Sequence, residues 1–205
     1  MNNASGMSCG THANSDRILR SMRIILADGT VLDTGDEASR RDFERTHPAL
    51  LAELTAIRDA VKADPELTAL INRKYSIKNV TGLNLRPFTA YDDVFDILAH
   101  CMVGSEGTLG FMSNVRVSTA PIQPFSASAM VYFKTIDEAS RAVVALRKGA
   151  PVDACELLDS KSLASVNDTT GDGLTALLIQ VTALSEQQLG YSQRIRPLQP
   201  CPLRD

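Results

Sequence analysis

The sequence predicts an α+β protein built from two parts. In the first part, two strand-like stretches, residues 20–33 and 111–119, flank a long helical region. In the second part, residues 127–182 alternate strand, helix, strand, helix and strand with short connections. The proline-containing segment 121–124 separates the two parts and coincides with a change of composition, so we expect a linker there.

The first strands are predicted to form a hairpin. From Met22 to Leu26, large apolar residues recur at every second position, as in a half-buried strand. Asp28-Gly29 follows, and this dipeptide is typical of a two-residue hairpin turn. The chain then returns through Thr30, Val31 and Leu32.

A helical insertion is expected over residues 37–73. Asp36 can cap its first helix, while Pro48 and Pro65 suit the first turns of the second and third. The apolar residues of the second helix recur at helical spacing and predict one buried face: Leu50, Leu51, Leu54, Ile57 and Val61. A further helix, over residues 92–101, leads into a glycine-rich stretch.

That stretch, Val103–Met112, is the one around which the chain is organised. Gly104, Gly107 and Gly110 alternate with polar residues, and glycine permits positive φ and close approach of a ligand to the backbone. Such a loop suits a polar planar ligand or a phosphate. Its spacing matches neither the phosphate loop nor the dinucleotide fingerprint, and a plain turn between a helix and a strand remains the alternative.

The second part is predicted to contain strands 127–134, 152–158 and 174–182 and helices 136–148 and 160–166. Residues 183–205 carry prolines, glutamines and arginines without a period, so we expect a disordered or non-homologous tail. The expected domains are therefore 1–122, 123–182 and the tail 183–205.

Composition excludes several classes of protein. A net charge of −3, no Trp and 5% aromatic residues argue against a nucleic-acid-binding protein. The apolar runs are too short for a transmembrane segment, and the start does not resemble a secretion signal. We expect a cytoplasmic protein, with peripheral attachment to a membrane left open. The four cysteines and three histidines are scattered, so no metal site is expected.

Five stretches, in this order, resemble the second lobe of the FAD-binding domain of the vanillyl-alcohol-oxidase/p-cresol-methylhydroxylase (PCMH) flavoproteins: Asn2–Gly6, Gly10–Thr11, Ile25–Val31, Lys78–Gly82 and Gly104–Phe111. Within that family the chain is most similar to the FAD-linked D-lactate and related D-2-hydroxyacid dehydrogenases, through residues 74–85 and 153–159. The resemblance covers about residues 1–182. It implies a second FAD-domain lobe followed by the start of a ferredoxin-like α+β cap domain.

The resemblance also implies a cofactor and its contacts. FAD is expected to lie along two loops whose matching residues are Asn2, Asn3, Ala4, Ser5 and Gly6, and Glu106, Gly107, Thr108, Leu109, Gly110 and Phe111. It implies oxidation of a small 2-hydroxyacid by hydride transfer from its C2 to flavin N5, with electrons leaving to a quinone, cytochrome or other acceptor. The catalytic residues are not identified.

The sequence also lacks parts of the family pattern. In the family, the loop that cradles the FAD pyrophosphate lies N-terminal to residue 1, and the groups that bind the substrate carboxylate or a metal lie beyond the matched region. Before residue 182 the sequence shows neither an acid–base candidate with a partner nor an Arg/His carboxylate clamp. We therefore expect a fragment of a flavin dehydrogenase. The alternative is a non-catalytic truncated remnant unable to hold FAD alone.

Overall fold

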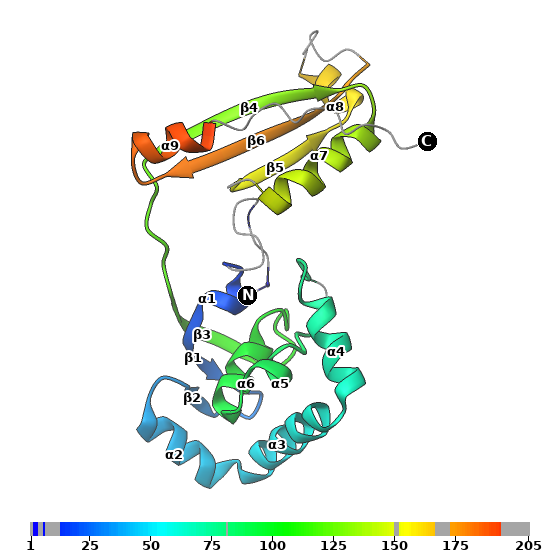
Figure 1. The fold of residues 1–205 in the computed structure, drawn as a ribbon. Coiled ribbons are helices and arrows are strands. Elements are labelled where there is room, and N and C mark those ends of the chain that lie inside the picture. Colours follow the sequence, from blue (N-terminus) through cyan, green and yellow to red (C-terminus); the bar gives the residue numbers. More distant parts are fainter. Residues whose placement is uncertain are drawn as a thin grey trace. The chain divides into compact units, whose positions relative to one another are not determined.

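The computed structural model describes residues 2–3, 6, 13–80, 82–149, 152–166 and 173–193. The chain divides into two compact units, residues 1–119 and 120–205 (Figure 1). Each unit combines helices with an antiparallel sheet, which agrees with the predicted α+β class.

In unit 1 the sheet has the order β2-β1-β3, formed by Val31–Asp33, Leu19–Ile25 and Phe111–Val117. The predicted hairpin is confirmed, with Ile25 paired to Val31. Its loop is longer than predicted, because Leu26 N–H donates to the Thr30 carbonyl and Gly29 N–H to the Leu26 carbonyl. Gly29 takes φ +85°, the left-handed conformation that glycine adopts without strain.

The helical insertion is confirmed as three helices: α2 (Glu37–Thr46), α3 (Pro48–Ala63) and α4 (Pro65–Lys74). Asp36 caps α2 as predicted, accepting from Ala38 N–H. The helix before the glycine-rich stretch is α6 (Val94–Met102). Two short helices, α1 (Ser15–Ile18) and α5 (Pro87–Ala90), were not predicted, since four residues are too few to show a helical period.

The core of unit 1 lies where α6 packs against both β1 and α3. It includes the following buried side chains: Leu19, Met22, Ile24, Leu32, Phe43, Leu51, Phe95, Leu98, Ala99, Met102 and Val103. The buried face of α3 is narrower than predicted. Leu51 and Leu54 pack against the core, whereas Ile57 is 47% exposed. The core therefore fixes α6, and with it the position from which the glycine-rich stretch leaves.

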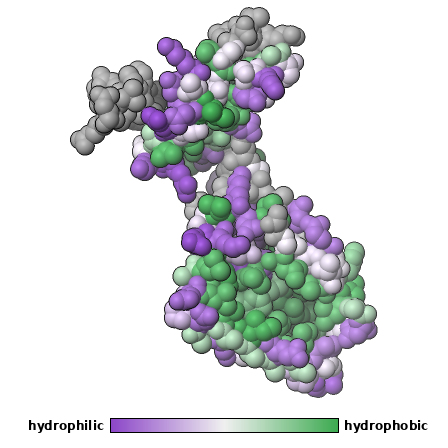
Figure 2. Space-filling view, turned by 90° about the vertical axis from the view of Figure 1, so that its right-hand side faces the viewer, coloured by the Kyte–Doolittle hydropathy of each residue, from purple (hydrophilic) through white to green (hydrophobic). Residues whose placement is uncertain are grey.

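Unit 1 also presents apolar side chains to its surface. On the face shown in Figure 2, hydrophobic residues form a broad area around a hollow. Exposed large hydrophobic residues occur on α4 and in the segment that follows it: Leu67, Leu70, Ile77, Val80, Leu83 and Leu85.

In unit 2 the sheet has the order β4-β6-β5, formed by Phe125–Phe133, Thr175–Ala183 and Ala154–Leu158. Helices α7 (Ile136–Gly149) and α8 (Ser160–Ser165) complete the predicted strand–helix alternation. The expected tail is wrong in its first part, because Glu186–Gln193 form helix α9, which packs on β4 and β6. Residues 194–205 lie outside the described part. No helix in the described ranges is long and apolar enough to cross a bilayer.

Candidate functional site

Unit 1 brings together described residues from three stretches with motifs that suggested a flavin site, namely residues 2–6, 78–82 and 104–111. The Asn3 side-chain amide lies 3.4 Å from the Asn79 carbonyl, and Lys78 Nζ donates to the Gly6 carbonyl at 2.8 Å. Gly104 packs so closely on Gly82 that a Cβ added at Gly104 would lie 3.3 Å from the Gly82 carbonyl oxygen. The 78–82 segment thus contacts both the 2–6 segment, 72 to 76 positions away, and Gly104 of the glycine-rich stretch. Ala4, Ser5 and Thr81 lie outside the described residues.

The glycine-rich loop owes its course to positive φ angles. Gly104 and Gly107 have φ +91° and +83°. Among the described residues, Glu106, at φ +52°, is the one residue other than glycine with a positive φ. Such a conformation is uncommon for a side-chain-bearing residue and costs free energy, so the surroundings must hold it. Within the loop, Thr108 donates through both its amide and its hydroxyl to the Ser105 carbonyl.

An open pocket of about 410 Å³ lies against this loop and the start of β3. Its lining includes four of the six residues predicted for the second loop, namely Glu106, Gly107, Gly110 and Phe111, together with Met112 and Val115. Thr108 and Leu109 do not line it. Phe111 is 67% exposed, so its ring is available to a planar ligand.

The hydroxyl of Ser105, in the same loop, is a second feature of the candidate site. Its Oγ is buried and has no hydrogen-bond partner among the described residues. A buried hydroxyl without a partner costs free energy, and in native proteins such a group calls for an explanation such as a ligand. Sequence reasoning placed Ser105 in the motif but did not assign it a contact.

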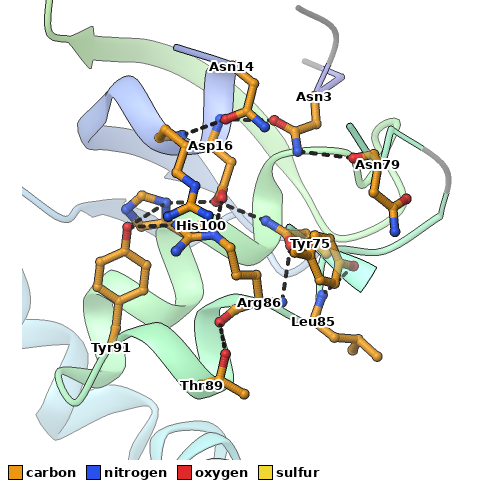
Figure 3. A network of polar contacts seen from close by, with 12 residues as sticks. Asn3, Asn14, Asp16, Tyr75, Asn79, Leu85, Arg86, Thr89, Tyr91 and His100 are labelled. Carbon is orange, nitrogen blue, oxygen red and sulfur yellow. Dashed lines mark hydrogen bonds and ion pairs between the residues drawn. The ribbon is translucent and has the colours of Figure 1, made fainter. Parts of the chain in front are cut away.

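Beside the loops lies a buried polar cluster around Asp16, shown in Figure 3. The Asp16 carboxylate accepts from Arg86 Nε at 2.5 Å, from Asn84 Nδ2 at 2.8 Å and from His100 Nδ1 at 3.0 Å. Tyr91 stacks on the His100 ring at 4.3 Å between centroids and accepts from Arg86 at 3.1 Å. We call these five residues the Asp16 cluster.

The charges in this cluster are balanced. Burial raises the pKa of Asp16, but hydrogen bonds from His100 and Arg86 outweigh burial and hold its pKa below the ordinary value. The carboxylate is therefore ionised, and it pairs with the Arg86 guanidinium. Burial, with a further contribution from the Asp16 charge, raises the pKa of the neighbouring Cys101 to about 12, which leaves that thiol protonated and unreactive.

The Asp16 cluster corrects one expectation. The sequence showed no histidine with a carboxylate partner before residue 182, yet His100 bonds Asp16 at 84 positions' separation. No local sequence pattern predicts such a pair, since Asp16 lies in α1 and His100 in α6. The cluster is also closed, with Asp16 1% and His100 5% exposed, so it does not form an open clamp for a substrate carboxylate.

The match to a family model lies in the second unit. Residues 122–193 match the family model described as FAD linked oxidases, C-terminal domain. This match extends past residue 182, where the resemblance was expected to stop, and includes α9.

A curated relative is the mitochondrial D-lactate dehydrogenase [cytochrome] of Arabidopsis thaliana, 33% identical over 79 residues. The matched region is 38% of this chain and 14% of that protein, so the chain spans a small part of its relative. Both comparisons point to the same family as the sequence motifs. Residues 122–193 are therefore similar to the C-terminal domain of FAD-linked oxidases.

Proposed function

We propose that unit 1 forms one wall of an FAD site in a flavin-dependent oxidoreductase of the D-lactate/D-2-hydroxyacid dehydrogenase type. The observation that carries this proposal is the meeting of the 2–6, 78–82 and 104–111 loops through Asn3–Asn79, Lys78–Gly6 and Gly82–Gly104 contacts. The similarity of residues 122–193 to the C-terminal domain of FAD-linked oxidases supports the proposal independently, since that match lies outside these loops.

The residues present fit such a cofactor. FAD requires close approach of backbone and directed hydrogen bonds at its ring and ribityl groups. The 104–111 loop offers positive-φ backbone, an open pocket and the Ser105 hydroxyl, which has no partner among the described residues. The volume of about 410 Å³ falls within the range of small-molecule sites and suits a part of FAD.

In this proposal the chain's residues bind and orient the cofactor. The expected contacts are the backbone of Asn2–Gly6 and of Glu106–Phe111, the Ser105 hydroxyl and the exposed Phe111 ring. The chemistry that FAD supplies when bound is acceptance, at flavin N5, of a hydride from C2 of the substrate. We assign His100 no acid–base role, because it is buried and its Nδ1 already donates to Asp16.

The substrate class rests on the relative, whose name gives D-lactate. We propose a small 2-hydroxyacid, with unit 2 as the start of a ferredoxin-like cap domain and unit 1 as a PCMH-type second lobe. Because the chain covers 14% of that relative, groups that bind the substrate carboxylate and the electron acceptor are expected outside the matched part.

A fluorescence titration of the chain with FAD tests the proposal, with Ser105→Ala and Ser113→Ala compared to the wild type. Ser113 provides a matched control, since its hydroxyl lies on β3 and donates to the Arg23 carbonyl. We expect Ser105→Ala to leave the melting temperature unchanged, because Oγ loses no partner among the described residues, and to raise the Kd for FAD by about three- to tenfold. Ser113→Ala should leave the Kd unchanged.

Two results would count against the proposal. Equal FAD affinity of the wild type and Ser105→Ala would remove the Ser105 contact. Failure of the wild-type chain to bind FAD at all would contradict the proposed wall and favour the truncated remnant that cannot hold FAD alone.

A further inference from the structure

The Asp16 cluster has a feature that the proposed function does not use: it touches all three candidate loops near their origins. The Asp16 amide donates to Asn3 Oδ1 at 3.0 Å, which holds the segment leading to Gly6. The Asp16 carboxylate accepts from Asn84, two positions beyond Gly82. It also accepts from His100, four positions before Gly104. Asp16 therefore contacts a residue within or close to each of the three loops.

These contacts are short and buried, so they restrict movement of the loops. Asn3 is 4% exposed, and Asn84 and Arg86 are 4% and 7% exposed. Asn84 in addition accepts from the Arg86 amide at 3.1 Å, which fixes the chain immediately after the 78–82 turn. Hydrogen bonds to a buried charge are among the stronger ones, and removal of the charge leaves the other partners unsatisfied.

The cluster itself is not placed to bind a ligand. Its side chains bond each other, with Arg86 and His100 both directed to Asp16 and Tyr91 stacked against His100 (Figure 3). Any effect of the cluster on ligand binding must therefore arise from its positioning of the loop backbone.

We infer that Asp16 is a positioning residue for the flavin wall, which fixes the three loops relative to one another through Asn3, Asn84 and His100 without contacting the cofactor. The inference rests on the proposed function for the identity of the ligand. The coupling of the three loops by Asp16 is a property of the free chain and can be measured without FAD.

The first measurement is FAD affinity in four variants. Asp16→Asn removes the charge at constant shape, and His100→Leu removes one donor. His100→Asn is the conservative counterpart, because its Nδ2 is the same number of bonds from Cβ as His Nδ1 and can still donate. Leu51→Ala lowers the stability of the unit 1 core without touching the cluster.

We expect Asp16→Asn and His100→Leu to raise the Kd for FAD by about tenfold or more, because each variant loses a hydrogen bond to a charged group. His100→Asn and Leu51→Ala should stay within about twofold of the wild type, compared at temperatures where each variant is folded. A rise in Kd that follows the melting temperature across all four variants would show a merely structural role and overturn the inference.

The second measurement is hydrogen–deuterium exchange of the free chain. Asp16→Asn and His100→Leu should accelerate exchange in peptides covering residues 2–6, 78–86 and 103–110 together, while His100→Asn should not. If these peptides exchange as in Leu51→Ala, the inference is wrong whatever the FAD titration gives. If the coupling is found but the wild type does not bind FAD, the proposed function fails and the positioning by Asp16 stands.

Discussion

At the scale of the residue, two aspartates of unit 1 are held ionised by different means. Asp16 is buried and relies on Arg86 and His100. Asp28 is exposed at the hairpin loop, where His47 Nε2 lies 2.9 Å from its carboxylate and the Thr30 amide donates at 2.8 Å. Both carboxylates have a lowered pKa, but a change at the buried one affects far more of the fold.

Replacement of Asp16 is expected to destabilise unit 1 strongly. Asp16→Ala leaves the Arg86 guanidinium buried without its counter-charge, which typically costs about 3–5 kcal/mol. The double variant Asp16→Ala/Arg86→Met should recover part of that loss, since no unpaired charge remains. Urea unfolding followed by circular dichroism measures both. Equal or greater loss in the double variant would contradict this account of the pair.

The pH dependence of stability follows from the lowered pKa of Asp16. Its contribution is complete above the unfolded-state pKa of about 3.9 and is lost as the pH falls towards the lower folded-state pKa. The free energy of unfolding of the wild type should therefore decline below about pH 4 more steeply than that of Asp16→Asn. Parallel curves for the two proteins would show that Asp16 has an ordinary pKa.

The Asp28–His47 pair gives a prediction at an exposed position. The hydrogen bond from His47, with help from Thr30, lowers the pKa of Asp28 to about 2. His47→Phe retains a ring to stack on Phe43, which lies 4.4 Å from His47 between centroids, but removes the donor. Carboxyl NMR titration should show the pKa of Asp28 rising towards its ordinary value without reaching it, because the Thr30 amide still donates. An unchanged pKa would exclude His47 as the main cause.

At the scale of the element, close packing fixes the end of the glycine-rich stretch. A Cβ at Gly110 would lie 2.9 Å from the Ile25 carbonyl oxygen and 3.2 Å from Met102 Cε, so β1 and α6 both restrict this position. Gly110→Ala should lower the free energy of unfolding by about 1–3 kcal/mol, as overpacking does. Gly149→Ala, where nothing lies within 4 Å, is the matched control and should be close to neutral. Equal stability of the two variants would refute this steric account.

The elements that could be predicted from sequence are those with a local cause. α2, α3 and α4 were predicted because Asp36, Pro48 and Pro65 mark their starts, and α3 also because apolar residues recur along it. The hairpin was predicted from Asp28-Gly29, though not the length of its loop. α9 was missed because its residues show no amphipathic pattern, and it is held by tertiary packing on β4 and β6.

The same reasoning divides the candidate site. The loops could be singled out because glycine and small polar residues are clustered along the sequence. The Asp16 cluster could not, since its charges are brought together by the fold from positions 70 and 84 apart. Ser105 was distinguishable from the other polar loop residues only by the burial of its hydroxyl.

At the scale of the whole molecule, the two units are joined by an exposed segment without regular structure. Residues 119–124 are exposed between β3 and β4, and Ile122 is 89% exposed. Brief digestion with a protease of broad specificity should therefore cut this segment and leave two protected fragments, identified by mass spectrometry. Cleavage within α3 or α7 while residues 119–124 stay intact would contradict the division into two units.

The central claim is that three loops of unit 1 form one wall of an FAD site, and amide chemical-shift mapping during an FAD titration tests it most directly. We predict saturable chemical-shift changes at the amides of Gly6, Gly82, Gly104 and Gly107 and of their neighbours. The amide chemical shifts of α2 and α3 should not change. Saturable shifts confined to unit 2, or none in any of the three loops at FAD concentrations that saturate flavin fluorescence, would contradict the claim.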